Sequence, residues 1–280
     1  MYFTVDSFVL TVAQTACVAL PAAGLPRWAD RFRTGAWALV LPLSIAVVVG
    51  AIALIPTTAD VLTWVALLLV PPGCALALGW ASHGARPWLA LLAAPLLALA
   101  WVLPDSRVGQ LAAIVLIVGS AVTLGRLLAG AAPLSLLKAG IIAMATVDAI
   151  LVFSNNLQGP NEVLVLATPG LGLPQLQSAS FGFAGLGYGD FFAAAVLGGV
   201  LAAERSPQLV AAVAMIGVTL CWKQLHLVYD VLPLTIPPAI VLIGVEVWKR
   251  RRAPQRVNSS AMIGSASGGP VTSSSSAPSA

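Results

Sequence analysis

Residues 139–154 read AGIIAMATVDAILVFS, and Asp148 is the only charged side chain among them. A second stretch, residues 183–203, reads FAGLGYGDFFAAAVLGGVLAA and has Asp190 as its only charge. Apolar runs of about 20 residues are typical of helices that cross a bilayer. An ionisable group at that depth costs about 2.5–3.5 kcal/mol on insertion scales and generally marks a function. The two stretches therefore predict membrane helices that carry functional carboxyl groups.

The composition of the whole chain supports a membrane protein. Of its 280 residues, 59% are hydrophobic and 9% are charged, and the mean hydropathy is +0.96. Soluble domains carry roughly 25% charged residues. The apolar runs are too long for barrel strands, so the spans must be helices. We predict an all-α integral membrane protein with one polytopic domain over residues 1–250. About nine spans are predicted: 7–25, 36–55, 61–80, 87–103, 108–125, 134–154, 181–203, 207–222 and 231–248.

The distribution of tryptophan and of basic residues gives the orientation. All eight Trp lie near predicted span ends, as in an aromatic belt: Trp28, Trp37, Trp64, Trp80, Trp88, Trp101, Trp222 and Trp248. Twelve basic residues fall in loops on one side: Arg27, Arg31, Arg33, Arg86, Arg126, Lys138, Arg205, Lys249, Arg250, Arg251, Arg252 and Arg256. Only Arg107 and Lys223 fall on the other side. The positive-inside rule then predicts an outer N-terminus and an inner C-terminus.

The charge and cysteine patterns argue against nucleic-acid binding, metal binding and a cleaved signal. The net charge of +4 follows from the basic inner loops and requires no nucleic acid, although the basic cluster could contact lipid head groups. The isolated Cys17, Cys74 and Cys221 share no metal-like spacing, so we expect neither metal nor cofactor. No basic residue precedes the first span, which argues against a cleaved signal. Residues 251–280, rich in Ser, Ala, Gly and Pro, are predicted to be a disordered cytoplasmic tail. Arg outnumbers Lys eleven to three, and this bias suggests a bacterium with a GC-rich genome. We therefore expect the protein to lie in the cell membrane.

Asp148 and Asp190 are predicted to lie at similar depths. At 1.5 Å per helical residue, Asp148 would lie roughly 9 Å and Asp190 roughly 13 Å below the outer face, on consecutive antiparallel helices. Two neighbouring carboxyl groups at low dielectric tend to share one proton. Such a pair can activate a water with one carboxylate and protonate a carbonyl with the other, as aspartic proteases do. Gly187 and Gly189, which flank Tyr188 before Asp190, would let the backbone kink and a partner backbone approach closely.

These motifs resemble the presenilin and signal peptide peptidase family of GxGD intramembrane aspartyl proteases. Residues 187–192, GYGDFF, are similar to the second catalytic motif of the family, and Val147-Asp148 is similar to its first, usually Tyr-Asp. Pro238-Ala239-Ile240 resembles its Pro-Ala-Leu element. The resemblance covers residues 1–250 and implies nine helices, with Asp148 and Asp190 catalytic and 238–240 binding substrate. Implied substrates are single-span membrane proteins or remnant signal peptides. The inferred orientation matches signal peptide peptidases and is opposite to that of presenilins.

Two local features refine these expectations. Residues 162–168 form an apolar run with β-branched side chains, and turn-forming residues flank it at Asn155-Asn156 and Pro169-Gly170. This pattern predicts a short strand. The edge of such a strand could hold an unwound substrate by backbone pairing. Pro233, Pro237 and Pro238 are expected to disturb the last span and to free backbone carbonyls.

Three alternatives stay open. The same two aspartates could form a proton or cation site in a transporter or channel. Prepilin peptidases share a GxGD string, but their acids belong near the cytoplasmic side. A catalytically silent relative would retain the motifs without activity.

Overall fold

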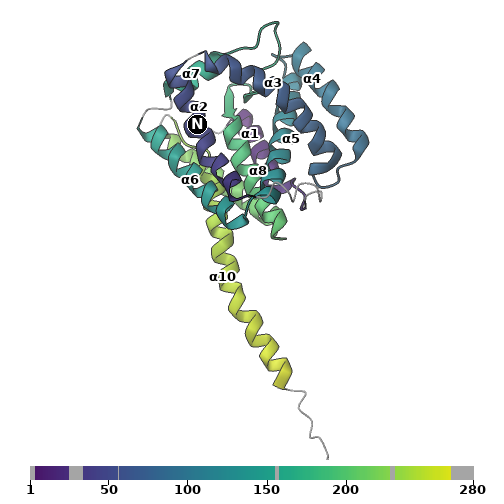
Figure 1. Ribbon diagram of the computed structural model, residues 1–280, viewed down its shortest axis with the longest axis vertical. Helices are drawn as coiled ribbons and strands as arrows, with labels where there is room; N and C mark the ends of the chain where they lie inside the picture. Colours follow the sequence, from purple (N-terminus) through teal and green to yellow (C-terminus); the bar gives the residue numbers. More distant parts are fainter. Residues whose placement is uncertain (1–3, 25–33, 56, 155–157, 228–230, 266–280) are drawn as a thin grey trace, which may run out of the picture. The chain divides into compact units, whose positions relative to one another are not determined.

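The computed structural model describes residues 4–24, 34–55, 57–154, 158–227 and 231–265. The chain divides into two compact units, Met1–Leu242 and Ile243–Ala280. In chain order, the elements are α1 (Val5–Ala19), η2 (Gly35–Leu39), α2 (Val40–Leu54), α3 (Thr58–Leu76), η3 (Ala77–Ala81), η4 (Pro87–Leu92), α4 (Ala93–Val102), α5 (Arg107–Ala131), α6 (Leu134–Phe153), α7 (Gln158–Leu166), β1 (Ser178–Phe181), β2 (Ala184–Gly187), α8 (Tyr188–Ala203), α9 (Gln208–Lys223), η5 (Gln224–Leu227) and α10 (Ile236–Ser265) (Figure 1).

The described chain is mostly helical, and four of its helical segments are long and apolar enough to cross a membrane. These segments are Gly35–Leu54, Thr58–Ala81, Arg107–Ala131 and Leu134–Phe153. Four further apolar helices are shorter: Val5–Ala19, Pro87–Val102, Tyr188–Ala203 and Gln208–Lys223. The prediction of a helical chain built on apolar runs is confirmed. The number of spans remains a prediction.

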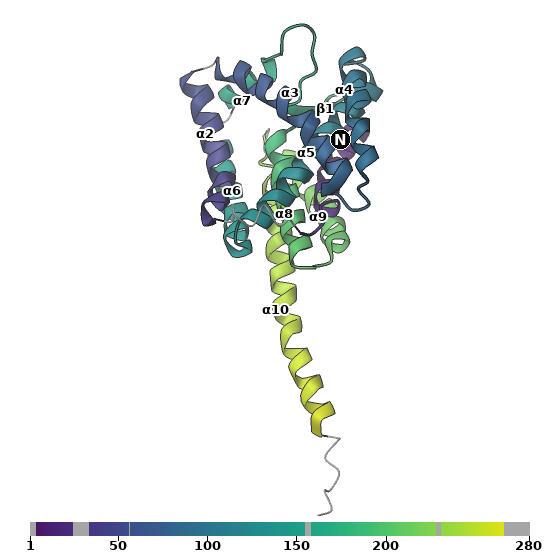
Figure 2. The same cartoon turned by 45° about the vertical axis from the view of Figure 1, so that its right-hand side comes forward.

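The centre of the first unit is α8, which packs against α1, α5 and α6. Figure 2 shows α6 beside α2 on one side of this centre and α4 on the other. Glycines bring the central helices into backbone contact: a Cβ at Gly125 of α5 would overlap the carbonyl of Ala195, and one at Gly199 of α8 would overlap that of Gly125. Close backbone approach through small residues is how helices associate in membranes, where burial of apolar surface gives little drive.

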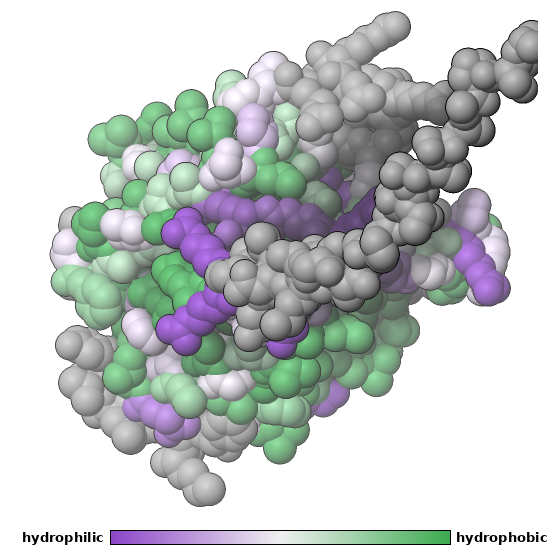
Figure 3. All heavy atoms as spheres, turned by 90° about the horizontal axis from the view of Figure 1, so that it is seen from below, coloured by the Kyte–Doolittle hydropathy of each residue, from purple (hydrophilic) through white to green (hydrophobic). Residues whose placement is uncertain are grey.

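Apolar and polar side chains are distributed as expected for a molecule with an apolar surround. Large hydrophobic side chains lie on the surface along several helices, among them Leu54 (84% exposed), Leu68 (74%) and Leu209 (73%). From below, Figure 3 shows apolar side chains over most of the coloured periphery of that face. In contrast, Thr11, Gln14, Ser120, Thr123 and Asp148 are buried. Exposed apolar surface this extensive marks contact with lipid or with other proteins.

Two predicted spans begin later than expected. Residues 178–187 form an antiparallel hairpin, with Ser178 paired to Gly187 and Phe181 to Ala184, so the helix predicted from residue 181 begins at Tyr188. The helix predicted from residue 231 begins at Ile236. Pro237 and Pro238 therefore lie in its first turn, where a missing N–H is tolerated. Pro237 and Pro238 thus do not disturb the helix that they begin. The expectation of free carbonyls is confirmed before it, since those of Pro233 and Leu234 accept hydrogen bonds from Trp222 Nε1 and Gln14 Nε2.

The strand predicted over residues 162–168 is also wrong, because that run lies mainly in α7. Pro160 stands in the first turn of α7, a position that favours helix initiation. Val163 and Leu164 then pack on a small core that contains Ile52 and Ala59. Tertiary packing thus outweighs the β propensity of the run. A β element does lie between α6 and α8, but it is the hairpin at 178–187.

The C-terminal region differs from the prediction in part. Helix α10 continues to Ser265 and so includes the first half of the tail predicted to be disordered. Some earlier predictions fall on residues outside the described ranges: those on Arg27, Trp28, Arg31, Arg33, Asn155-Asn156 and residues 266–280.

Candidate functional site

Asp148 is carried by α6 and is buried, with 7% of its surface exposed. The hydroxyl of Thr235 donates to Asp148 Oδ2 at 2.5 Å, and the backbone N–H of Thr235 also interacts with this carboxyl group. Thr235 lies directly before α10, so the start of the last helix is held beside Asp148. Met144, one turn before Asp148, is also buried and lies beside Gly189.

Asp190 lies in the first turn of α8, directly after the hairpin. Gly187 is the N-cap residue, and its backbone N–H interacts with the Asp190 carboxylate. An acidic side chain at the third helical position that reaches back to the N-cap N–H is the acidic half of a capping box. The sequence therefore begins the helix at this point and fixes the carboxylate by the same contact.

The two carboxyl groups interact electrostatically with one another. They reach this arrangement because α6 ends and α8 begins at the same end of the helix pair, which is the arrangement expected of consecutive antiparallel helices. The depths estimated from helical rise do not apply to Asp190, since the residues before Tyr188 are not helical.

The residues between and around the glycines take other roles than expected. The Tyr188 hydroxyl shares a hydrogen bond of 2.9 Å with Ser120 of α5 and thus ties α8 to α5. A Cβ at Gly187 would lie 3.7 Å from Asp190 Oδ2, and one at Gly189 would lie 3.9 Å from Met144. These are ordinary contact distances, so no close backbone approach requires glycine at 187 or 189. The expected close approach of a partner backbone was therefore wrong, whereas the expected change in backbone direction is present, because β2 ends at Gly187 and α8 begins at Tyr188.

The segment Pro238-Ala239-Ile240 lies in the first turns of α10. Pro238 and Ala239 are buried, whereas Ile240 is 41% exposed and lines an open apolar groove along α9. The other residues of the groove are Ala214, Gly217, Val218, Cys221, Trp222 and Leu225. The contact with Asp148 comes from Thr235, three residues before Pro238.

Three polar side chains near the dyad were not predicted from the sequence. Gln14 of α1 donates through Nε2 to the Asp190 carbonyl at 3.3 Å and to the Leu234 carbonyl at 3.1 Å. Lys223, predicted to lie in an outer loop, interacts with Asp190 from the end of α9. Thr235 is the third. Gln14 could have been predicted from the sequence, because a polar side chain within an apolar span must find a hydrogen-bond partner. Nothing local distinguishes Thr235 from other threonines.

The turn of the hairpin is held by α1 and α5. Asp6 Oδ1 accepts from Arg107 Nη1 at 2.5 Å, and Asp6 Oδ2 accepts from the Phe183 N–H at 3.3 Å. The Arg107 guanidinium also lies over the ring of Phe181, 4.6 Å from its centroid. The hydrogen bond from Arg107 holds the pKa of Asp6 below its usual value. Gly182 adopts a φ of +58°, and a Cβ there would overlap the Asp6 carboxylate.

Comparison with family models, with curated proteins and with solved structures gives no match for this chain. The fold and the site define a class only: a helical protein with many exposed apolar side chains and with two aspartates, Asp148 and Asp190, that interact between its helices.

Proposed function

We propose that the protein crosses the cell membrane about nine times and acts as an intramembrane aspartyl protease through Asp148 and Asp190. The observation that carries the proposal is the pairing of Asp148, which is buried, with Asp190, which is half-buried, between largely apolar helices. Each acid would be costly in lipid without a use. The order of three motifs also supports the proposal, because it resembles the order in the presenilin and signal peptide peptidase family. The motifs are Val147-Asp148, then GYGD at 187–190, then Pro-Ala-Ile at 238–240. The substrates proposed are single-span membrane proteins or remnant signal peptides.

The proposed reaction uses the dyad as an acid–base pair. One carboxylate takes a proton from a water, whose oxygen bonds to the scissile carbonyl carbon, while the other carboxyl group protonates the carbonyl oxygen. Collapse of the resulting diol breaks the C–N bond as the amide nitrogen receives the proton that the first carboxylate took. The second carboxylate recovers its proton from the diol, so the dyad returns to its starting state.

The hairpin supports this function as a place to hold an unwound peptide. The described sheet has two strands, and β2 ends at Gly187, three residues before Asp190. A peptide paired to a strand edge by backbone hydrogen bonds would be extended and directed toward the dyad.

Cleavage of a defined substrate tests the proposal. The purified protein in liposomes should cut a single-span reporter whose N-terminus lies on the same side as the C-terminus of the protease. Asp148→Asn and Asp190→Asn should each abolish the cut. Asp60→Asn, at the exposed start of α3, is a matched control that should keep full activity. If wild type cuts no reporter in a panel, the silent-relative alternative replaces this proposal. If the aspartate variants lose proton or cation flux but keep cleavage, the transporter alternative replaces it.

A further inference from the structure

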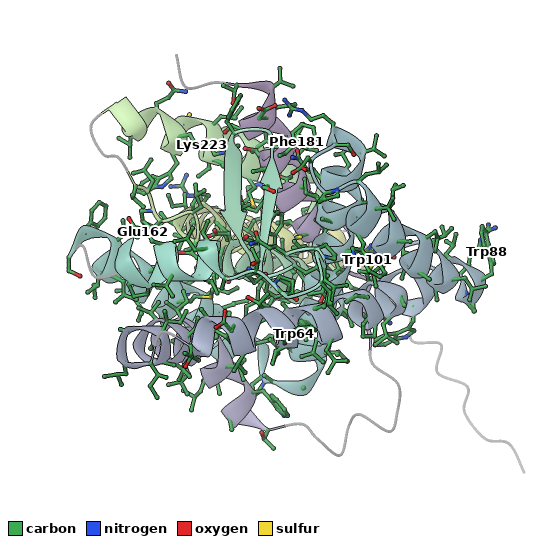
Figure 4. The ribbon with its side chains drawn as sticks, turned by 90° about the horizontal axis from the view of Figure 1, so that it is seen from above. Trp64, Trp88, Trp101, Glu162, Phe181 and Lys223 are labelled. Carbon is green, nitrogen blue, oxygen red and sulfur yellow. The ribbon has the colours of Figure 1, made fainter. Side chains whose placement is uncertain are left out.

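Helices α1 and α9 are antiparallel, and polar side chains join them at both ends. At one end, Lys223 of α9 donates through Nζ to the Ser7 carbonyl at 3.2 Å, to the Ser7 hydroxyl at 2.9 Å and to the Thr11 hydroxyl at 2.8 Å. At the other end, Gln208 donates through Nε2 to the Val18 carbonyl at 3.2 Å. Figure 4 labels Lys223 in the view from above. These bonds fix which residues of the two helices face each other.

Thr15 and Thr219 lie one turn deeper in the same interface. Thr15 is one turn after Thr11 on α1, and Thr219 is one turn before Lys223 on α9. Residues one turn apart share a helix face, so both threonines continue the faces that are joined by the Thr11–Lys223 bond. The two side chains are buried, with 6% and 0% of their surface exposed. Neither hydroxyl has a hydrogen-bond partner in the part of the chain that the structure describes.

Other helical threonines use their hydroxyl within their own helix. Thr11, Thr63 and Thr146 each donate to the carbonyl of the preceding turn at 2.9 Å. Thr15 and Thr219 make no such bond. A buried hydroxyl without a partner is costly, and in proteins an ordered water generally supplies the missing partner. The two hydroxyls therefore indicate a water-binding site between α1 and α9.

Polar side chains connect this site with the surface and with the dyad. Toward the surface, Ser7 and Lys223 are half-buried, so water can reach them. Toward the dyad, Gln14, the neighbour of Thr15 on α1, donates to the Asp190 carbonyl at 3.3 Å. The polar residues thus continue from the end where α1 begins to the first turn of α8.

The deeper half of the interface is tightly packed. A Cβ at Gly198 of α8 would lie 2.5 Å from the Cys17 carbonyl oxygen, so the backbones of α1 and α8 are in contact there. Met215 of α9, one turn deeper than Thr219, is 0% exposed. Gln208 closes this end, since it also donates to the Gly198 carbonyl at 3.2 Å. This packing favours a water route from one side only.

We infer that water enters between α1 and α9 from the side on which α1 begins, binds between Thr15 and Thr219, and supplies the dyad from that side. The inference rests on the proposed function for its purpose, because hydrolysis of each peptide bond consumes one water. The binding of water to the two threonines is independent of cleavage.

The reaction of introduced thiols with Ag⁺ tests the route and its side. In a Cys221→Ser background in liposomes, Thr15→Cys and Thr219→Cys should react about tenfold faster or more when Ag⁺ is added on the side where α1 begins, because a bare ion avoids apolar surroundings. Mass spectrometry of the thiol that remains for alkylation after unfolding measures this. Val12→Cys, on the exposed side of α1, and the buried native Cys17 should react slowly from both sides. If both threonine positions react as slowly as these controls, or equally fast from both sides, the inference is overturned.

Melting temperatures test the bound water without a reagent. Thr15→Val and Thr219→Val keep the shape and remove the hydroxyl. If each hydroxyl binds water, its loss should lower the melting temperature, as in the control Thr63→Val, which loses a hydrogen bond to the Ala59 carbonyl. An unchanged or raised melting temperature in both variants is expected of dry, unpaired hydroxyls and overturns the inference. If no reporter is cut, the proposed function fails, and the two measurements still decide whether water binds here.

Discussion

In the proposed reaction, Asp148 and Asp190 divide one chemical task, and this has a measurable consequence for double substitutions. Each acid would perform half of a proton-transfer cycle, so loss of either should abolish cleavage. The variant with both Asp148→Asn and Asp190→Asn should retain the same residual rate as either single variant, because groups that act as a unit are not additive. Comparison of the three rates against one reporter measures this. A double variant that is clearly slower than both single variants would mean independent roles.

The proposed sharing of one proton between Asp148 and Asp190 also predicts a bell-shaped pH profile. Activity should fall at high pH, where the proton of the pair is lost, and at low pH, where neither carboxyl group can act as a base. The profile of kcat/KM for wild type measures both limbs. A rate that stays level across the acidic and the alkaline range would argue against a carboxyl pair.

Thr235 gives a second prediction for single residues. Its side chain is 2% exposed, and its hydroxyl is the donor to Asp148. Thr235→Val keeps the shape but removes the donor and should lower kcat roughly 10- to 150-fold, since a hydrogen bond to a charged carboxylate contributes about 1.5–3 kcal/mol. Thr235→Ser keeps the donor and should retain most of the activity. Equal activity of the Val and Ser variants would show that the hydroxyl does not orient Asp148.

The hairpin turn makes a prediction about one structural element. The lowered pKa of Asp6 means that its contacts stabilise the folded protein above the ordinary pKa of an aspartate, and that this contribution is lost as pH falls through the lower, folded-state pKa. Asp6→Asn should therefore melt below wild type at pH 7. The difference should begin to shrink below the usual aspartate pKa and vanish only below the lower, folded-state pKa. Thermal melts of both proteins from neutral pH down to the most acidic pH at which they still fold measure this, and a difference that is constant with pH would contradict it.

The crossing of α5 and α8 makes another prediction at this scale. At Gly125 an added methyl group would overlap backbone, whereas at Gly217 of α9 no atom lies within 4 Å of an added Cβ. Gly125→Ala should destabilise the protein by about 1–3 kcal/mol through overpacking. Gly217→Ala should be neutral or slightly stabilising, because Ala favours a helix interior. Melting temperatures in the same detergent compare the two, and equal effects would mean that α5 and α8 do not cross this closely.

The sequence predicted helices better than it predicted where they begin. Apolar runs identified every long helix, since length and hydrophobicity alone set that signal. The starts of α8 and α10 were misplaced, because residues 181–187 and 231–235 are apolar without being helical. For the site, the carboxyl pair was predictable from charge within apolar runs. Its partners Thr235 and Lys223 come from elements more than 70 residues away from Asp148, and no local pattern specifies such contacts.

At the scale of the whole molecule, the distribution of basic residues predicts the orientation in the membrane. In a variant with Cys221→Ser, a cysteine placed at Asp105 should react with an impermeant thiol reagent in intact cells. A cysteine placed at Ser275 should react only after permeabilisation. Cys17 and Cys74 are buried and serve as a silent background. Labelling of the tail in intact cells would reverse the topology, and with it the expected direction of substrates.

The junction between β2 and α8 has no intervening residue, because the strand ends at Gly187 and the helix begins at Tyr188. An insertion there would rotate Asp190 by about 100° around the helix for each added residue. By contrast, residues 167–177 lie between α7 and β1 in no helix or strand and include the left-handed Leu171 and Gly172. Insertions and deletions that arise during evolution of this gene should therefore be tolerated in residues 167–177 and selected against at the junction. Selection at the junction would keep the distance from the hairpin to Asp190 constant.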